Sequence, residues 1–205
     1  MNEFNRCGPI ITRISGPIAT VTFNRPDERN SLPTKIIDSL DLALSDLSAN
    51  TELQTIIFTG TGSTFLSGAD IRELTTLNPQ TARDFSRKGQ VLFEKIASAP
   101  QLTIAAINGY CIGGGLDLAL ACDIRVASAT AIFAHPGARL GIITGWGGTQ
   151  RLPRIIGKAR ALEFFFTART LTSKEALEIE LVSSVGDPVL DCALKFSRKQ
   201  TRMAE

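Results

Sequence analysis

Three consecutive glycines, Gly113 to Gly115, are the residues of this sequence best suited to chemistry. A strand-like run at 102–107 leads into them, and a helix-like run at 116–121 leads out. Glycine lets a ligand approach the backbone closely, and a helix N-terminus presents unpaired N–H groups with a partial positive charge. Asp117 lies one turn inside this helix. The pattern predicts a site that holds a developing negative oxygen, and it indicates an enzyme fold.

Other glycine-rich motifs do not fit this segment. A P-loop requires Lys and then Ser or Thr after its last glycine, whereas Leu116 and Asp117 follow here. A dinucleotide fingerprint requires Gly-x-Gly-x-x-Gly, and the glycines at 109, 113, 114 and 115 have a different spacing. Close packing of a strand against a helix is the simpler alternative, but one or two glycines suffice for it.

The sequence supports neither a serine or cysteine hydrolase nor a metal enzyme. It contains no Gly-x-Ser-x-Gly elbow, and His135 is its only histidine. Cys111 and His135 can be imagined as nucleophile and base, but a cysteine beside a strand end is more often a small buried residue. A lone histidine is likewise more often structural than a base. One histidine without a carboxylate cluster argues against a metal site.

The elements that position the glycine run alternate between strands and helices. Alternating apolar residues predict a hairpin at 10–14 and 18–23 and further strands at 55–59, 102–107, 123–127, 131–134 and 182–185. Helical spacing predicts helices from Pro33, at 70–77, up to Pro100, at 148–155 and 158–167, from Ser173 and after Asp187-Pro188. Strand–loop–helix units recur at 55–77, 102–121 and 124–155, and they predict an α/β architecture.

The composition is that of an ordinary globular protein. The 205 residues are 43% hydrophobic and 20% charged, which favours one domain or one domain with a small appendage. A formal net charge of +2 with mixed signs indicates neither a nucleic-acid partner nor a membrane surface. The densest basic cluster resembles a solvated helix face more than a polyanion site, although it could steer an anionic cofactor. This cluster comprises Arg151, Arg154, Lys158 and Arg160.

The sequence also predicts where the protein resides. No apolar run is long enough to span a bilayer, and residues 1–6 lack the layout of a signal peptide. The four cysteines have neither metal-ligand nor disulfide-framework spacing, which is typical of reduced thiols. They are Cys7, Cys111, Cys122 and Cys192. We therefore expect a soluble cytoplasmic protein.

Six segments resemble the crotonase superfamily, also called the enoyl-CoA hydratase/isomerase family, in order and in spacing. They are Asn24–Leu32, Phe65–Leu74, Ala105–Arg125, Phe133–Pro136, Leu140–Arg154 and Ala168–Val182. The resemblance implies an α/β fold of the crotonase type, a spiral of repeated ββα units with a short C-terminal helical extension. It implies a core at 1–187 that carries a CoA-thioester site. Residues 188–205 would be the start of a C-terminal helical region that is truncated relative to the family.

The resemblance also implies site residues. The backbone N–H groups of Ala69 and Gly114 would form an oxyanion hole for the thioester carbonyl, which becomes enolate-like during the reaction. The segment Ala69, Asp70, Ile71 and Arg72 would lie along the CoA, although Asp70 is equally an ordinary helix cap. Trp146 and Thr144 would face the acyl pocket, with a core tryptophan as the alternative. CoA would enter as part of the substrate, with no permanently bound cofactor and no metal.

The reacting carboxylates are where this sequence departs from the pattern. Hydratases of the family use two glutamates, and the first position here is Asp117, one methylene shorter. An acid in a first helical turn is also stabilised by the dipole, so catalytic and structural interpretations of Asp117 stay open. The second position is Gly137, so that acid is absent, and Gly145 stands where some branches carry an aspartate. Losing a positioned acid or base costs about 10²–10⁴-fold, which predicts weak hydration.

Two alternatives to a weak hydratase remain. The first is another crotonase reaction in which an anion or water fills the space at Gly137, as bicarbonate does in the naphthoyl-CoA synthase branch. The second is a non-catalytic CoA-binding paralogue. The resemblance implies a homo-oligomer, a trimer or a dimer of trimers, whose C-terminal helices pack between subunits. This sequence stops at Glu205, and whether that short C-terminus is natural stays open.

Overall fold

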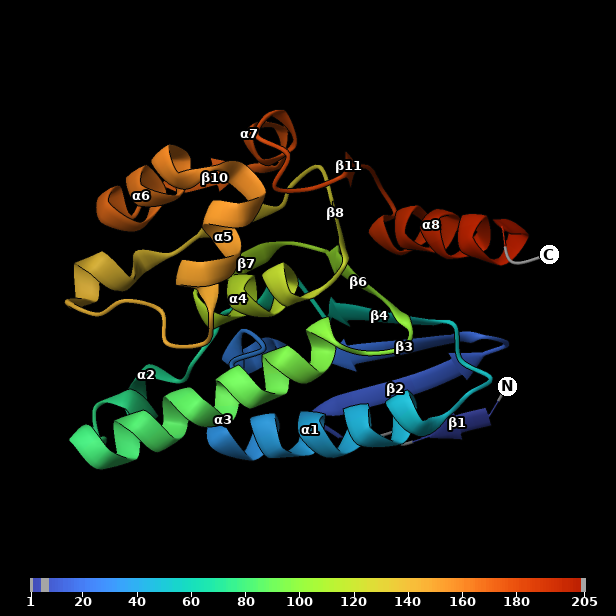
Figure 1. The fold of residues 1–205 in the computed structure, drawn as a ribbon, viewed down its shortest axis with the longest axis horizontal. Coiled ribbons are helices and arrows are strands. Elements are labelled where there is room, and N and C mark those ends of the chain that lie inside the picture. Colours follow the sequence, from blue (N-terminus) through green and yellow to red (C-terminus); the bar gives the residue numbers. More distant parts are fainter. Residues whose placement is uncertain (1, 5–7, 204–205) are drawn as a thin grey trace.

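We describe a computed structural model, which defines the backbone of residues 2–4 and 8–203 and the side chains of residues 8–197. Cys7 lies outside these described residues. A seven-stranded sheet forms the centre, in the order β1-β2-β3-β4-β6-β8-β11 (Figure 1). Its strands are β1 (Asn2–Phe4), β2 (Ile10–Ser15), β3 (Ile18–Phe23), β4 (Thr55–Gly60), β6 (Leu102–Ile107), β8 (Ile124–Ala127) and β11 (Ser184–Val185). The predicted hairpin is confirmed as β2 and β3, and the later strands run parallel.

A second sheet of four short strands has the order β10-β9-β7-β5. These strands are β5 (Thr64–Leu66), β7 (Tyr110–Ile112), β9 (Ile132–Ala134) and β10 (Thr170–Thr172). Only β9 was expected from the sequence. All four strands are three residues long and pair with segments far away in the chain, and the sequence shows no clear strand pattern for β5, β7 and β10.

The helices follow the strands in a regular way. They are α1 (Thr34–Ala49), α2 (Ile71–Leu74), α3 (Pro79–Ala97), α4 (Gly114–Ala121), α5 (Gly148–Ile156), α6 (Lys158–Thr167), α7 (Ser173–Glu178) and α8 (Val189–Met203), with 3₁₀ helices η1 (Pro26–Glu28) and η2 (Pro136–Leu140). Three times, a strand of the large sheet leads to a strand of the small sheet and then to helix: β4-β5-α2, β6-β7-α4 and β8-β9-η2. The chain is therefore α/β, as predicted, and built from repeated ββα units.

Some predicted boundaries were wrong for local reasons. The helix expected at 70–77 ends at Leu74, and Asn78 instead caps α3, where its side chain accepts from the N–H groups of Gln80 and Thr81 at 2.9 Å. The strand expected from Asp123 begins at Ile124, because the Asp123 carboxylate accepts from Thr103 N and Oγ1, both at 2.8 Å. The last strand, expected at 182–185, is limited to the two residues of β11.

Both faces of the large sheet are covered. Alternate residues of its parallel strands point to opposite sides, so Ile56 and Phe58 join the main core while Ile57 packs beneath α8. α1 and α3 lie side by side on the main-core side (Figure 1), and α8 packs against β4, β6 and β8 on the other face of the sheet. The predicted division at 187/188 falls between β11 and α8, and it stays a prediction. None of the described helices is long and apolar enough to cross a membrane.

Candidate active site

A cavity of about 1310 Å³ opens at one edge of the small sheet. Strands β5, β7 and β9 are parallel, so their carboxyl ends lie at the same edge. Ala69, Gly114 and His135 each follow one of these strands by one to three residues. All the site residues that the sequence predicted line this cavity: Ala69, Asp70, Ile71, Arg72, Gly114, Asp117, Gly137 and Trp146.

Two backbone amides lie next to each other at the start of α4. Gly113 precedes the helix with φ +55° and ψ −122°, a conformation that an L side chain rarely adopts. Gly68 has φ +88°, and a Cβ there would lie 2.6 Å from Gly114 N. Ala69 N is 3.4 Å from the place a Cβ on Gly114 would take. Within the described residues, neither the Ala69 N–H nor the Gly114 N–H donates a hydrogen bond, so both are available to an acceptor in the cavity.

Trp146 both lines the cavity and belongs to the core. Its side chain is packed between Gly89 of α3 and Gly114 of α4, and a Cβ on either glycine would overlap the indole. Its Nε1 donates to Phe85 O at 3.3 Å, and its ring packs against those of Phe85 and Phe93 at centroid distances of 5.1 and 5.6 Å. Trp146 is therefore a core residue that also borders the cavity, and its contact with an acyl group stays a prediction.

Asp117 is a buried carboxylate held by its neighbours. The residue is 2% exposed, and its Oδ2 accepts a hydrogen bond from Thr144 Oγ1. Its Oδ1 lies against Gly148, where a Cβ would overlap it, and 3.5 Å from His135 Nε2. α5 can approach α4 this closely because its first residue is a glycine. Asp117 is thus fixed at the inner wall of the cavity rather than projecting across it.

The loop around Gly137 closes over the position of the missing acid. A Cβ on Gly137 would lie 2.6 Å from Ile142 O, and Ile142 N–H donates to Gly137 O at 3.0 Å. A Cβ on Gly145 would similarly lie 2.5 Å from Ser86 Oγ. At Gly137 a side chain would overlap a backbone oxygen, so a carboxylate there requires the backbone to shift. At Gly145 the obstacle is the end of the Ser86 side chain, which can rotate.

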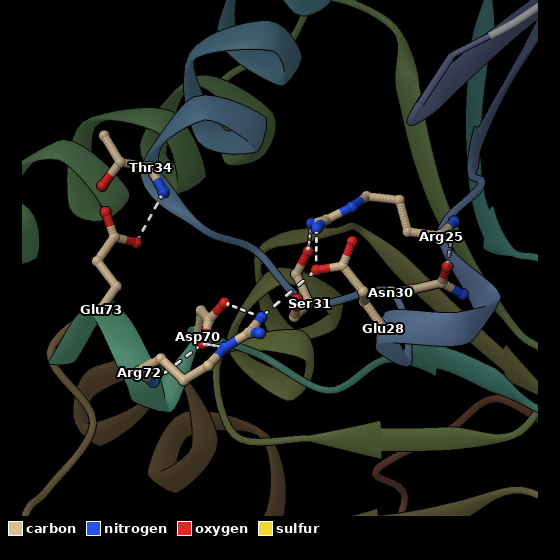
Figure 2. A network of polar contacts seen from close by, with 8 residues as sticks. All are labelled: Arg25, Glu28, Asn30, Ser31, Thr34, Asp70, Arg72 and Glu73. Atoms are coloured by element: carbon tan, nitrogen blue, oxygen red, sulfur yellow. Dashed lines mark hydrogen bonds and ion pairs between the residues drawn. The ribbon is translucent and has the colours of Figure 1, made fainter. Parts of the chain in front are cut away.

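The mouth of the cavity carries a network of charges (Figure 2). Asp70 caps α2 by accepting from Arg72 N at 2.9 Å, and it also pairs with the Arg72 guanidinium at 2.7 Å. These contacts hold the pKa of the Asp70 carboxyl below its usual value. Glu28 pairs with Arg25 and approaches Arg72 at 3.5 Å, while Glu73 accepts from Thr34 N at the start of α1. Asp70 is therefore the helix cap that the sequence allowed, and the mouth is polar.

Comparison with known proteins places this chain in a family. Residues 13–202 match the enoyl-CoA hydratase/isomerase family model. The short-chain-enoyl-CoA hydratase of Clostridium acetobutylicum is 38% identical over 180 residues, which cover 87% of this chain and 69% of that protein. The putative enoyl-CoA hydratase/isomerase YngF of Bacillus subtilis is 41% identical over 83% of this chain and 66% of its own length. The chain belongs to the enoyl-CoA hydratase/isomerase family.

Solved structures agree with this assignment. The crystal structure of an enoyl-CoA hydratase from Bacillus anthracis matches with a TM-score of 0.90 and 34% identity, over 94% of this chain and 76% of that one. The structure of DspI from Pseudomonas aeruginosa matches with a TM-score of 0.91 and 31% identity, over 97% and 77%. The predicted crotonase fold is confirmed. The chain spans about two thirds of the length of the two relatives named above.

Several alternatives for this family member can now be judged. Cys111 is fully buried in β7, and burial together with the nearby Asp117 charge raises the pKa of its thiol well above the usual value, so it is a poor nucleophile. Among the described residues, no three His, Cys, Asp or Glu side chains gather closely enough to hold a metal ion. Within the basic cluster, Arg151 is half-buried, pairs with Glu94 at 3.0 Å and donates to Trp146 O at 3.3 Å.

His135 lines the cavity although it was not among the site residues predicted from the sequence. It is 5% exposed, lines the cavity and stacks edge-on against Phe165 at a centroid distance of 5.2 Å. The sequence interpretation was that of a structural histidine. Its proximity to Asp117 depends on the pairing of β7 with β9, which no local pattern reveals. The one available signal was its position two residues before Gly137, at the place of the absent acid.

Proposed function

We propose that this protein acts on an acyl-CoA thioester through an enolate whose oxygen is held by the N–H groups of Ala69 and Gly114. The observation that carries this proposal is the pair of adjacent amides, without acceptors among the described residues, at the edge of a large cavity. Fixed donors bind a developing oxyanion more strongly than a ground-state carbonyl, so they lower the barrier to enolate formation. The names of the relatives, enoyl-CoA hydratases among them, support the same substrate class.

In this proposal the substrate lies along the whole cavity. The CoA part follows Ala69, Asp70, Ile71 and Arg72, where the mouth is polar and the Arg72 side chain is 79% exposed. The acyl part lies toward Trp146, whose ring forms an apolar wall against Phe85. CoA enters as part of the substrate, and the proposal requires no permanently bound cofactor.

Ordinary hydration of a 2-enoyl-CoA is expected to be slow in this protein. Gly137 supplies no second acid, and loss of a positioned acid or base costs about 10²–10⁴-fold. The rate is measured with crotonyl-CoA, beside a family hydratase that carries both glutamates, by the loss of the enoyl thioester absorbance. Hydration at the rate of that hydratase would show that the role given to Gly137 is wrong.

Enolate formation itself is tested without water addition. Saturated butyryl-CoA in deuterated water exchanges its Cα protons whenever an enolate forms and is reprotonated, and mass spectrometry follows the exchange. We expect exchange in the presence of the protein well above the spontaneous rate. Binding of butyryl-CoA without exchange, hydration or double-bond migration would contradict the enolate proposal and would favour the non-catalytic paralogue.

Replacing Gly137 with glutamate is expected not to restore hydration. The first side-chain carbon would meet Ile142 O at 2.6 Å, and such overpacking costs about 1–3 kcal/mol of unfolding free energy. Urea unfolding measures the stability of Gly137→Glu, and Gly137→Ala is the matched control because it carries the same Cβ without the carboxylate. A stable Gly137→Glu protein that hydrates crotonyl-CoA rapidly would support a paralogue that has lost only this acid.

The contact between Gly137 and Ile142 O also bears on which group, water or an anion, would be bound at Gly137. A carbonyl oxygen, that of Ile142, borders this position, and carbonyl oxygens accept hydrogen bonds. A water molecule suits this neighbour better than bicarbonate does. Any measured activity is therefore expected to be indifferent to added bicarbonate.

We further propose that the protein is a homo-oligomer, either a trimer or a dimer of trimers, and that it is cytoplasmic. Apolar side chains on the outside of α6 support association with further copies, since Phe166 is 77% exposed and Leu162 lies beside it on the helix. Light scattering coupled to gel filtration measures the mass in solution.

A further inference from the structure

His135 and Asp117 are buried side chains, and each has one polar atom that lacks a hydrogen-bond partner within the described residues. His135 Nε2 and Asp117 Oδ1 are 3.5 Å apart, and within the described residues neither atom makes a hydrogen bond. A buried polar atom left unpaired costs about 1–3 kcal/mol. The distance is slightly longer than a formed hydrogen bond, and such bonds in ligand-free sites often tighten when substrate is bound.

The other ring nitrogen of His135 lies near Gly137. Nδ1 lies 3.7 Å from the place a Cβ on Gly137 would occupy, so the ring extends from Asp117 toward the position of the absent acid. His135, Asp117 and Gly137 all line the same cavity. Contact with the Phe165 ring restricts the imidazole on its other side.

We propose that His135 is the catalytic base and acid of this site, and that Asp117 is the residue that positions it. This inference rests on the proposed function. Nδ1 takes a proton from the substrate Cα, and the C–H electron pair moves into the enolate. The negative charge then rests on the thioester oxygen, facing the N–H groups of Ala69 and Gly114. Return of the proton from Nδ1 to the substrate completes the cycle without any other reactant.

The arrangement assigns each ring nitrogen a distinct task. With Nε2 protonated and directed at Asp117 Oδ1, Nδ1 has a free lone pair and can accept a proton. The imidazolium formed in this step is stabilised by the adjacent carboxylate. Asp117 cannot easily serve in place of His135, because Thr144 already donates to its Oδ2 and its Oδ1 is enclosed by Gly148 and His135.

The test replaces His135 with glutamine. The glutamine amide can still donate to Asp117 but cannot take up a proton, so it preserves a structural role and removes a catalytic one. We expect His135→Gln to bind butyryl-CoA as tightly as the wild-type protein and to exchange its Cα protons about 10²–10⁴-fold more slowly. Exchange at the wild-type rate in His135→Gln would overturn the inference and leave the enolate proposal intact. Absence of exchange, hydration and double-bond migration in the wild-type protein would overturn both.

A second measurement needs no variant. His135 is the only histidine of the chain, so isotopic labelling of histidine gives one set of ring signals in the wild-type protein. We expect these signals to shift on addition of butyryl-CoA and to shift less with CoA, which lacks the reacting carbon. Ring signals that respond equally to both ligands would overturn the assignment of Nδ1 to the substrate Cα, even where His135→Gln fails to fold.

Discussion

An Asp117→Asn protein is expected to exchange the Cα protons of butyryl-CoA about 10²–10⁴-fold more slowly than the wild-type protein. Asparagine has nearly the shape of aspartate, and its amide oxygen can still accept from Thr144 Oγ1. What it lacks is the negative charge beside His135 Nε2, 3.5 Å away. Without that charge the imidazolium is not stabilised. An asparagine NH₂ group can also turn the His135 ring away from the orientation in which Nδ1 accepts the proton.

The measurement is the initial exchange rate at saturating butyryl-CoA, with the affinity for the thioester determined separately. We expect the affinity to be unchanged, because Asp117 lies at the inner wall, away from the polar mouth. Asp46→Asn is a matched control, since this aspartate is exposed on α1 and lies outside the cavity lining. If Asp117→Asn exchanges protons as fast as Asp46→Asn, the carboxylate is only structural.

Gly114→Ala is expected to be less stable than the wild-type protein and to lose about 10²–10³-fold in turnover. The added methyl group would overlap the six-membered ring of Trp146 and lie 3.4 Å from Ala69 N. Overpacking of this kind costs about 1–3 kcal/mol, whereas the better helix propensity of alanine recovers at most about 1 kcal/mol. If α4 moves to relieve the overlap, the Gly114 amide moves away from that of Ala69.

Gly89→Ala separates the two consequences of Gly114→Ala. A Cβ on Gly89 overlaps the same indole from the α3 side, but Gly89 contributes no amide to the cavity edge. We expect both variants to lose unfolding free energy in urea, and only Gly114→Ala to lose most of its Cα exchange. Equal losses of exchange in the two variants would show that the position of Trp146, rather than the pair of amides, limits the reaction.

Elements defined by local side-chain patterns were predictable from the sequence. The hairpin of β2 and β3 alternates apolar and polar residues. Helix α1 buries apolar residues at helical spacing, namely Ile36, Ile37, Leu40, Leu44 and Leu47. In these elements the spacing of apolar residues in the sequence therefore indicates which side is buried. β5, β7 and β10 were not predicted, because their side chains give no clear local strand pattern and the strands are defined by pairing with distant segments. The last helix was predicted from Asp187-Pro188 and an apolar stripe, and Val189 and Ala193 are indeed buried against the sheet.

For the site, the sequence alone determined its residue types and its family. The glycine run, the segment with Ala69 and the glycine at 137 are all visible in the order of residues, and their resemblance to the family implies a thioester oxyanion hole with one acid absent. Only the tertiary structure decided which groups surround Gly137, the position of the absent acid. Pairing of β7 with β9 places His135 beside Asp117, and the turn that brings Ile142 O onto Gly137 means that a carboxylate there requires the backbone to shift. Contacts between residues distant in the chain follow from strand pairing and close packing, which a single sequence does not encode locally.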